Sequence, residues 1–411
     1  MPALQVSPIV AALDHPEVTL DRETVPAVAL SLVDAFAQVP DPRKARGIRH
    51  GVAAILLLGA CAVLTGARSF AAIAEYAHDT GHTILDTLGV GAVVPHACTI
   101  RRVLSDLDPA AVEAAMRAWV QAQLAQTPEP DGVPAREQRQ VLAVDGKTVR
   151  GARISTSTAA ATAEGYRQPH LVSALDQASG AVLGQVAVEE KGSEVAAFTT
   201  LLDTLDLTDV LVTADAAHTN RNHADYLHER GGHYLLTAKR NQPTLLRRLR
   251  ALPWAQIGVA ARERGRGHGR VEARTISVVN LDPCPDRGGE FFPHAAQAIK
   301  VVRRRRVLGS RKWTTVTVYA ITSLTALQAD PVLLARWLRG HWAIEALHWV
   351  RDVSFDEDRS QVRTGNGPQI MAALRNLVIT ALRLAGVTNI AAALRHHARD
   401  PHRPLATYKI T

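Results

Sequence analysis

The stretch VLAVDGKTVRG, residues 141–151, indicates most about how this chain folds and works. It opens with four apolar residues, as a buried strand does, and Asp145 ends that apolar run. Moving an ionised carboxylate out of water costs several kcal/mol unless cations or hydrogen bonds compensate it, so an acid here indicates a site. The alternative, which this stretch leaves equally open, is a structural Asp that ends the strand and pairs with Lys147.

A second apolar run, VLVTADAAHT at residues 210–219, places Asp215 just beyond the end of another strand. Three further elements are predicted nearby: a strand hairpin at 169–189, a helix at 194–205 and a strand at 233–243. This order predicts antiparallel strands followed by parallel strands that helices connect. Ligands of such open sheets gather at the carboxyl ends of strands, where Asp145 and Asp215 both lie. Asp176 falls in the hairpin turn and is assigned to the turn rather than the site.

A late helix is predicted from Asp330 and Pro331, which form a strong helix start, to residue 352. Its apolar residues repeat at intervals of four and three and form a buried stripe: Leu333, Trp337, Gly340, Ile344 and Leu347. Beside that stripe runs a polar file that contains Glu345 together with His341, His348 and Asp352. Glu345 is therefore expected beside the buried face, although an exposed surface Glu remains the alternative.

Asp145, Asp215 and Glu345 together suggest a metal site. Clustered carboxylates repel one another, and divalent cations are their usual remedy. Ligand sets made only of oxygen favour Mg²⁺ or Mn²⁺ over zinc. Two such ions can activate a water or hydroxyl and stabilise the leaving oxygen of a phosphodiester.

The composition is typical of a folded protein whose positive surface attracts polyanions such as nucleic acid. The 411 residues are 47% hydrophobic and 21% charged, and the net charge is +8. Three widely spaced cysteines form no CxxC pair, which favours a reducing, cytoplasmic compartment. No signal peptide is recognised, and the apolar run at 51–66 is too short for a membrane span and is expected as a buried helix. No Walker loop or dinucleotide fingerprint implies a nucleotide cofactor.

The predicted organisation follows changes of composition along the chain. The segments are a flexible lead-in at 1–24, a helical domain at 25–126, a Pro-rich linker at 127–140, the first part of an α/β core at 141–243, a β-rich basic insertion at 244–329, the last part of the core at 330–388, and a basic, frayed tail at 389–411.

Two segments are candidate DNA readers. The short N-terminal helices, with Arg101 and Arg102 at the start of one, fit a helix-turn-helix reader or, equally, a small packing bundle. In the insertion, the run of four arginines at 303–306 fits phosphate contacts or, equally, a solvated edge strand that charge protects from aggregation.

Taken together, VLAVDGKTVRG, VLVTADAAHT, LTAKRNQP at 236–243 and RGHWAIEALHWVRDVSFDEDRSQVR at 339–363 resemble the DDE transposases of bacterial insertion sequences. The similarity is greatest to the branch that includes the H-repeat-associated proteins, and it covers most of the chain. It implies a mixed α/β, ribonuclease H-like sheet after a small helical domain. It also implies that Asp145, Asp215 and Glu345 hold two divalent cations.

The resemblance further implies a reaction and its partners. The enzyme would cleave the ends of its element, free a 3′-hydroxyl and join it to target DNA, acting as a homo-oligomer on double-stranded DNA. The rivals are a nuclease on the same scaffold that does not join strands, and a DNA-binding relic without catalysis. Related transposases carry Tyr, Arg and Lys around the last acid, where this chain has Leu338, His341 and Asp352.

That mismatch leaves the DNA contacts to other residues near the acids. The candidates are Lys147, Arg150, Lys239, Arg240, Asn241, Arg339, His341 and Arg351.

Overall fold

The computed structural model describes residues 30–46, 48–126, 132, 134–155, 165–188, 194–267, 269–281 and 291–411. The expected lead-in at 1–24 and most of the first half of the expected linker lie outside these residues. The described part of the chain has no helix long and apolar enough to cross a membrane.

Six helices form the N-terminal part of the described chain, and a short seventh precedes the sheet. They are α2 (Leu32–Ala37), α3 (Val52–Leu64), α4 (Phe70–Asp79), α5 (His82–Thr87), α6 (Ala97–Asp106), α7 (Pro109–Ala125) and α8 (Ala135–Gln138). Serine or aspartate side chains cap α2, α4 and α7 by accepting backbone N–H groups of the first turn. The apolar run at 51–66 forms α3, which is buried along nearly its whole length, as the sequence predicts.

The central sheet has the predicted mixed order. Its first five strands run β5-β4-β1-β6-β7, in which β1 pairs antiparallel with β4 and parallel with β6. The elements are β1 (Val141–Thr148), β4 (His170–Asp176), β5 (Val182–Val188), α9 (Glu194–Leu202), β6 (Leu211–Ala214), the 3-10 turn η1 (Ala216–His218), α10 (Arg221–Glu229) and β7 (His233–Ala238), with a small separate hairpin of β2 (Ile154–Ser155) and β3 (Tyr166–Arg167). This strand order is that of a ribonuclease H-like fold.

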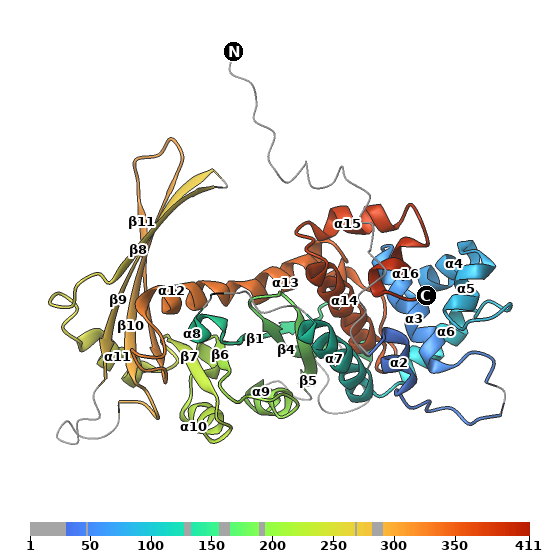
Figure 1. Cartoon of the computed structure of the whole chain (residues 1–411), viewed down its shortest axis with the longest axis horizontal. Helices are drawn as coiled ribbons and strands as arrows, with labels where there is room; N and C mark the ends of the chain where they lie inside the picture. The colour runs from blue at the N-terminus through green and yellow to red at the C-terminus, as the bar shows by residue number, and fades with distance from the viewer. Residues whose placement is uncertain are drawn as a thin grey trace, which may run out of the picture.

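The β-rich insertion extends this same sheet. After α11 (Pro243–Ala251) come β8 (Ala261–Gly267), β9 (Arg270–Asn280), β10 (Gln297–Val307) and β11 (Thr314–Thr322). Strand β11 pairs antiparallel with β7, so that the sheet has nine strands ending in β11-β10-β9-β8. These four strands, called the arm below, project at the end of the molecule opposite the N-terminal helices (Figure 1).

Helices cover both faces of the core sheet. Helices α12 (Pro331–Gly340) and α13 (Trp342–Val353) lie along one face, and α9 and α10 lie along the other (Figure 1). The predicted single helix is thus divided at His341, which follows Gly340, a poor helix former against which the Gln177 side chain packs closely. The predicted apolar stripe is otherwise confirmed, because Leu333, Trp337, Ile344 and Leu347 are all buried.

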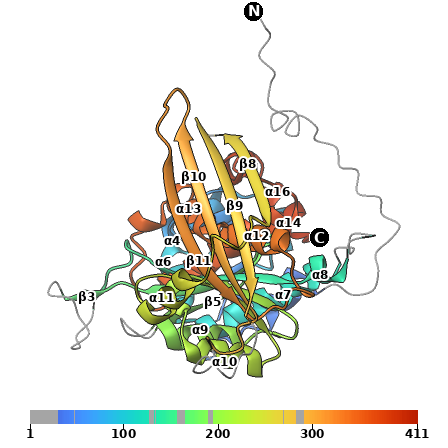
Figure 2. The same ribbon diagram turned by 90° about the vertical axis from the view of Figure 1, so that its left-hand side faces the viewer.

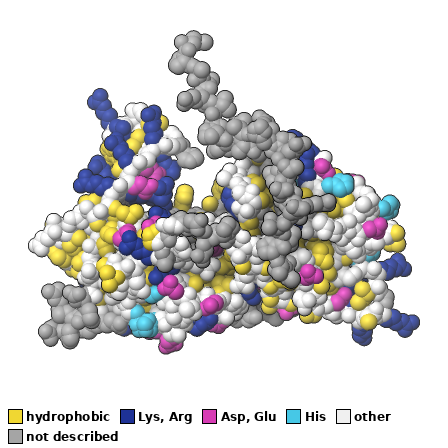
Figure 3. Space-filling view, viewed as in Figure 1, with side chains coloured by type: hydrophobic (Ala, Val, Ile, Leu, Met, Phe, Trp, Pro, Cys, Tyr) yellow, Lys and Arg dark blue, Asp and Glu magenta, His cyan; other side chains and the backbone are white. Residues whose placement is uncertain are grey.

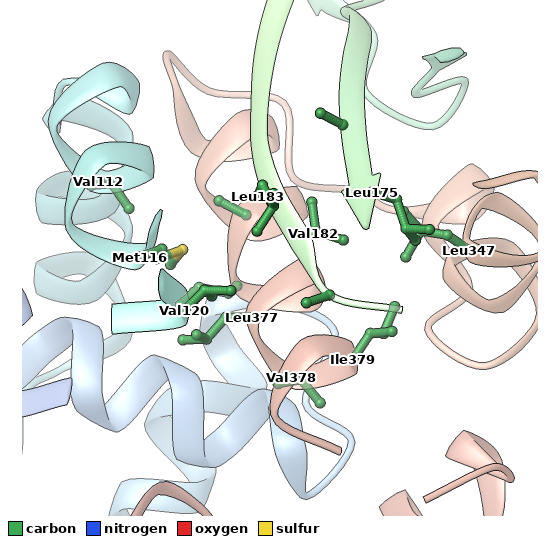
Figure 4. Close-up of a cluster of buried hydrophobic side chains, with 14 of the residues drawn as sticks. Val112, Met116, Val120, Leu175, Val182, Leu183, Leu347, Leu377, Val378 and Ile379 are labelled. Carbon is green, nitrogen blue, oxygen red and sulfur yellow. The ribbon is translucent and has the colours of Figure 1, made fainter. Parts of the chain in front are cut away.

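The C-terminal helices join the core to the N-terminal helices. After the turn η3 (Glu357–Arg359) follow α14 (Gly367–Leu384), α15 (Ile390–His397) and α16 (Arg403–Tyr408). Figure 4 shows side chains of α14, α7, β4, β5 and α13 in one apolar cluster. The basic tail expected at 389–411 is instead helical, because its apolar side chains find a surface: Tyr408 packs edge-on against Trp119 and is buried.

Candidate active site

Asp145 and Asp215 lie at matching positions on two adjacent parallel strands. The register pairs Ala143 with Thr213 and Val144 with Ala214, so Asp145 and Asp215 are the next residues along the two segments. Strand β6 ends there because Asp215 caps the turn η1, accepting the Ala217 N–H at 2.7 Å. Asp215 directly follows β6, as the sequence predicts, whereas the expected strand end at Asp145 is wrong, because β1 continues to Thr148 through its pairing with β4. The two carboxylates lie where the pairing between β1 and β6 ends, at the carboxyl end of β6.

Glu345 lies in the first turn of α13, on the helix face that meets this edge. On the same face, His341 Nδ1 lies 3.0 Å from the Thr213 hydroxyl, and His348 Nδ1 lies 3.6 Å from Asp145 Oδ2. Residues three and four apart share a helix face, so Glu345 lies between these two histidines. Its side chain is exposed, as the sequence alternative allows, although the helix face that carries it is turned to the aspartates.

The two histidines beside the acids are neutral at physiological pH. Burial lowers the pKa of His341 to about 4, although the nearby Asp215 acts in the opposite direction. Burial, followed by the charges of Arg351 and Lys147, lowers the pKa of His348 to about 3. Neither imidazole therefore supplies a positive charge beside the carboxylates.

Lys147 takes part in fastening α13 to β1. Its ammonium lies 2.6 Å from Asp352 Oδ1 and 3.2 Å from Asp358 Oδ1, and its side chain is buried. The sequence left open an ion pair between Lys147 and Asp145. Lys147 instead pairs with acids of α13 and of the following turn. A DNA contact by Lys147 requires those pairs to open.

Arg351 is a correction to the sequence interpretation. Its side chain is fully buried, where it pairs with Glu357 at 2.9 Å and donates to Gln185 at 3.0 Å. Arg375 of α14 pairs with the same Glu357 at 2.9 Å. Arg351 is thus a packing residue of the core, out of reach of DNA in this fold. The only sequence feature that indicates this burial is the position of Arg351 on the apolar side of the helix.

The other candidate DNA contacts are on the surface or at its edge. Lys239, Arg240 and Asn241 are exposed in the loop after β7, where the Asn241 amide donates to the Ala216 carbonyl of η1. Arg150 is 75% exposed, and Arg339 pairs with Glu263 of the arm. His341 is neutral and engaged with Thr213, so it does not replace a cationic side chain.

The donor chemistry of the site suits a hard divalent cation, but the ligand set is not assembled. Asp145, Asp215 and Glu345 offer only carboxylate oxygens, which Mg²⁺ and Mn²⁺ prefer. Among the residues that the structure describes, no group of three or more His, Cys, Asp or Glu side chains is arranged to hold a metal ion. Asp145 and Asp215 are adjacent where the pairing of β1 and β6 ends, and the Glu345 side chain is exposed.

The strand order and the position of the acids place the chain in the class of ribonuclease H-like proteins. Two family models match it: a DDE transposase-associated domain at residues 33–120 and a transposase DDE domain at residues 136–381. The second match spans more than half of the chain. The protein therefore belongs to the DDE transposases.

Curated relatives agree with this assignment. The chain is 30% identical over 369 residues to a putative transposase, YncI, of Escherichia coli O157:H7, with 86% of this chain and 87% of the relative covered. It is 27% identical over 362 residues to the H repeat-associated putative transposase YhhI of Escherichia coli K12, covering 85% and 90%. The predicted membership in the branch of H-repeat-associated transposases is thus confirmed.

A comparison with solved structures finds the piggyBac transposase synaptic complex with hairpin DNA. The TM-score is 0.38 at 11% sequence identity, with 92% of this chain and 78% of that chain covered.

Proposed function

We propose that this transposase cleaves DNA at the ends of its insertion sequence and joins the freed 3′-hydroxyl to target DNA, with Asp145, Asp215 and Glu345 as its catalytic acids. The observation that carries the proposal is the matched position of the two aspartates on adjacent parallel strands, beneath the helix face that carries Glu345. Double-stranded DNA is the proposed substrate, and a homo-oligomer that pairs two ends is the proposed working form.

Divalent cations, Mg²⁺ or Mn²⁺, are the proposed cofactors, and when bound between the carboxylates they would supply Lewis acidity to the scissile phosphodiester. Two features support this role: the strand register sets Asp145 beside Asp215, and Glu345 lies in the first turn of α13. The exposed Lys239 and Arg240, in the loop after β7, are proposed to hold the DNA backbone beside the acids.

The test uses the full chain and DNA that carries the inverted repeats flanking its coding region. Cleavage and joining are measured with Mg²⁺, with Mn²⁺ and with EDTA, and DNA binding is measured separately by gel shift. Asp145→Asn, Asp215→Asn and Glu345→Gln should each reduce cleavage by a factor of a thousand or more while DNA binding remains. A matched control is Asp225→Asn, a carboxylate on α10 at the opposite face of the sheet.

The outcomes separate the proposal from its rivals. Products joined to target DNA, lost in the three variants and kept in Asp225→Asn, support transposition. Cleavage without joining would instead identify a nuclease. If the wild-type chain binds these ends but cleaves them with neither metal, it acts as a DNA-binding protein and the catalytic assignment fails.

A further inference from the structure

The arm presents two chemically different faces, because side chains alternate along a strand and opposite residues on paired strands share a face. We call the outer face the one whose cationic residues are Arg262, Arg264, Arg266, Lys300, Arg304 and Arg306. Among the described residues of β8 to β11, that face has no Asp or Glu. The four consecutive arginines of β10 are therefore divided between the two faces, two on each.

The inner face carries arginines and acids together. Glu272 pairs with Arg270 at 2.7 Å and with Arg274 at 3.1 Å, so these positive charges are compensated within the arm. Glu263 pairs with Arg339 of α12. Below these charges the inner face packs on α12 through a shared apolar cluster that includes Ile276 and Leu333.

The inner face thus continues the side of the sheet on which α12 and α13 lie, where Asp145 and Asp215 are. The outer face lies on the other side. Figure 2 shows β8, β9 and β10 from the end of the molecule, in front of α12 and α13. The acids and the outer face are therefore on opposite sides of one continuous sheet.

The outer face holds its cations in an ordered array. The Trp313 ring lies 5.1 Å from the Arg304 guanidinium and 5.2 Å from that of Arg306, so that the two side chains stack on one indole. Val271 is buried beside Arg306 and Arg266, and with Arg264 these residues line a shallow hollow of about 580 Å³. Figure 3 shows Lys and Arg side chains gathered over the free end of the arm.

These cations lie close enough to act on one polyanion. Alternate residues of a strand are ~7 Å apart and paired strands ~5 Å apart, which is within the Debye length of ~8 Å at physiological salt. Within the described arm no acid of the outer face offsets their mutual repulsion, whereas the inner face is offset by Glu263 and Glu272. A row of arginines fixed on a rigid strand surface is suited to successive phosphates of a nucleic-acid backbone.

We propose that the outer face of the arm binds the phosphate backbone of duplex DNA at a stretch separate from the one that enters the active site. This inference rests on the proposed function for the nature of the polyanion and adds the surface that holds it. It predicts that loss of the outer arginines weakens binding without altering the chemical step.

The test compares two double variants of the same strand. Arg304→Gln with Arg306→Gln removes two charges from the outer face, and Arg303→Gln with Arg305→Gln removes two from the inner face. The affinity of the full chain for a duplex carrying the element end and its flanking DNA is measured over a range of salt concentrations. Thermal melting of both variants verifies that the arm is folded.

The outer pair should reduce the slope of log K against log salt by about 2, since each phosphate contact contributes ~0.9. The inner pair should change the slope by less than half of that. With DNA at saturation, the cleavage rate of the outer variant should stay within about twofold of the wild type. An equal change of slope in both variants, or none in either, overturns the inference, because only net charge or no contact would then be involved.

The result is independent of catalysis. If the two double variants change the salt slope as expected but the wild-type chain cleaves no DNA, the inference about the outer face is supported and the proposed function fails. If the chain cleaves DNA but neither double variant changes the salt slope, the inference about the outer face fails and the proposed function stands. Binding to anionic phospholipid vesicles in place of DNA, lost in the outer variant, overturns the inference in favour of a membrane surface.

Discussion

Arg351 and Glu357 are fully buried although both carry charge, and their environment explains why both are ionised. Burial alone would raise the pKa of Glu357, but Arg351 and Arg375 lower it to about 2. In the same network, the Gln185 side-chain oxygen accepts hydrogen bonds from Arg351 and from the Asn376 amide. Removing one member of such a buried ion group is costly, because it leaves the charge of its partner buried without compensation.

We therefore expect Glu357→Gln to lower the free energy of unfolding by about 3–5 kcal/mol, because it leaves two buried guanidinium groups without a full countercharge. Urea unfolding at pH 6 measures this. Asp356→Asn, at the neighbouring and more exposed carboxylate, is the control and should cost less than about 1 kcal/mol.

The same residue predicts a dependence on pH. The pKa of Glu357 is lower in the folded chain, about 2, than its ordinary 4.5. Its stabilisation is therefore complete above about pH 4.5 and is lost as the pH falls toward 2. The difference in melting temperature between wild type and Glu357→Gln should narrow from pH 6 to pH 3. A constant difference would show that Glu357 is not charged in the fold.

At the scale of elements, two segments far apart in the sequence pack against each other near Asp145. The segment after β1, which ends at Gly151, lies directly against the turn η3 that follows α13. Lys147 makes the ionic part of that contact with Asp352 and Asp358. The position of Glu345 relative to Asp145 consequently depends on packing between residues 145–151 and residues 352–360.

Gly151→Ala should disturb this packing. A Cβ at Gly151 would lie 2.6 Å from Ser360 N and 2.9 Å from the Asp358 carbonyl, and backbone atoms cannot move aside cheaply. We expect a loss of about 1–3 kcal/mol in thermal or urea unfolding, together with slower DNA cleavage. Gly258→Ala is the control, since no atom lies within 4 Å of its added Cβ. Equal stability of the two variants would show that the η3 backbone can shift away from the added Cβ at little cost.

At the scale of the whole molecule, the N-terminal helices share their core with the rest of the chain. Helix α14 packs on α3, α6 and α7 as well as on β5, and Tyr408 of α16 lies against Trp119. The polar network also reaches α7, where Gln185 donates to Glu113, whose pKa burial raises to about 7. The helices at 30–126 are thus completed by segments more than two hundred residues later.

A fragment of residues 1–126 should accordingly fail to fold alone, since it exposes the apolar surface that α14 and α16 cover. Circular dichroism and amide proton spectra would show a largely disordered chain, whereas the full chain gives one set of dispersed signals. Tyr408→Ala in the full chain should cost about 3–5 kcal/mol, as for other large aromatic deletions. His402→Ala, at an exposed site of the same segment, is its control. A well-folded fragment would contradict this single core.

The sequence by itself determined the local features of this protein. The apolar runs before Asp145 and Asp215, the start of α12 at Asp330 and the periodic stripe of α12 and α13 are properties of residues close together in the chain, so pattern alone predicted them. Only the tertiary structure decided the rest. Whether a charge such as that of Arg351, Arg304 or Arg303 meets an acid, a core or solvent depends on segments distant in sequence, because electrostatic interactions and burial act through space rather than along the chain.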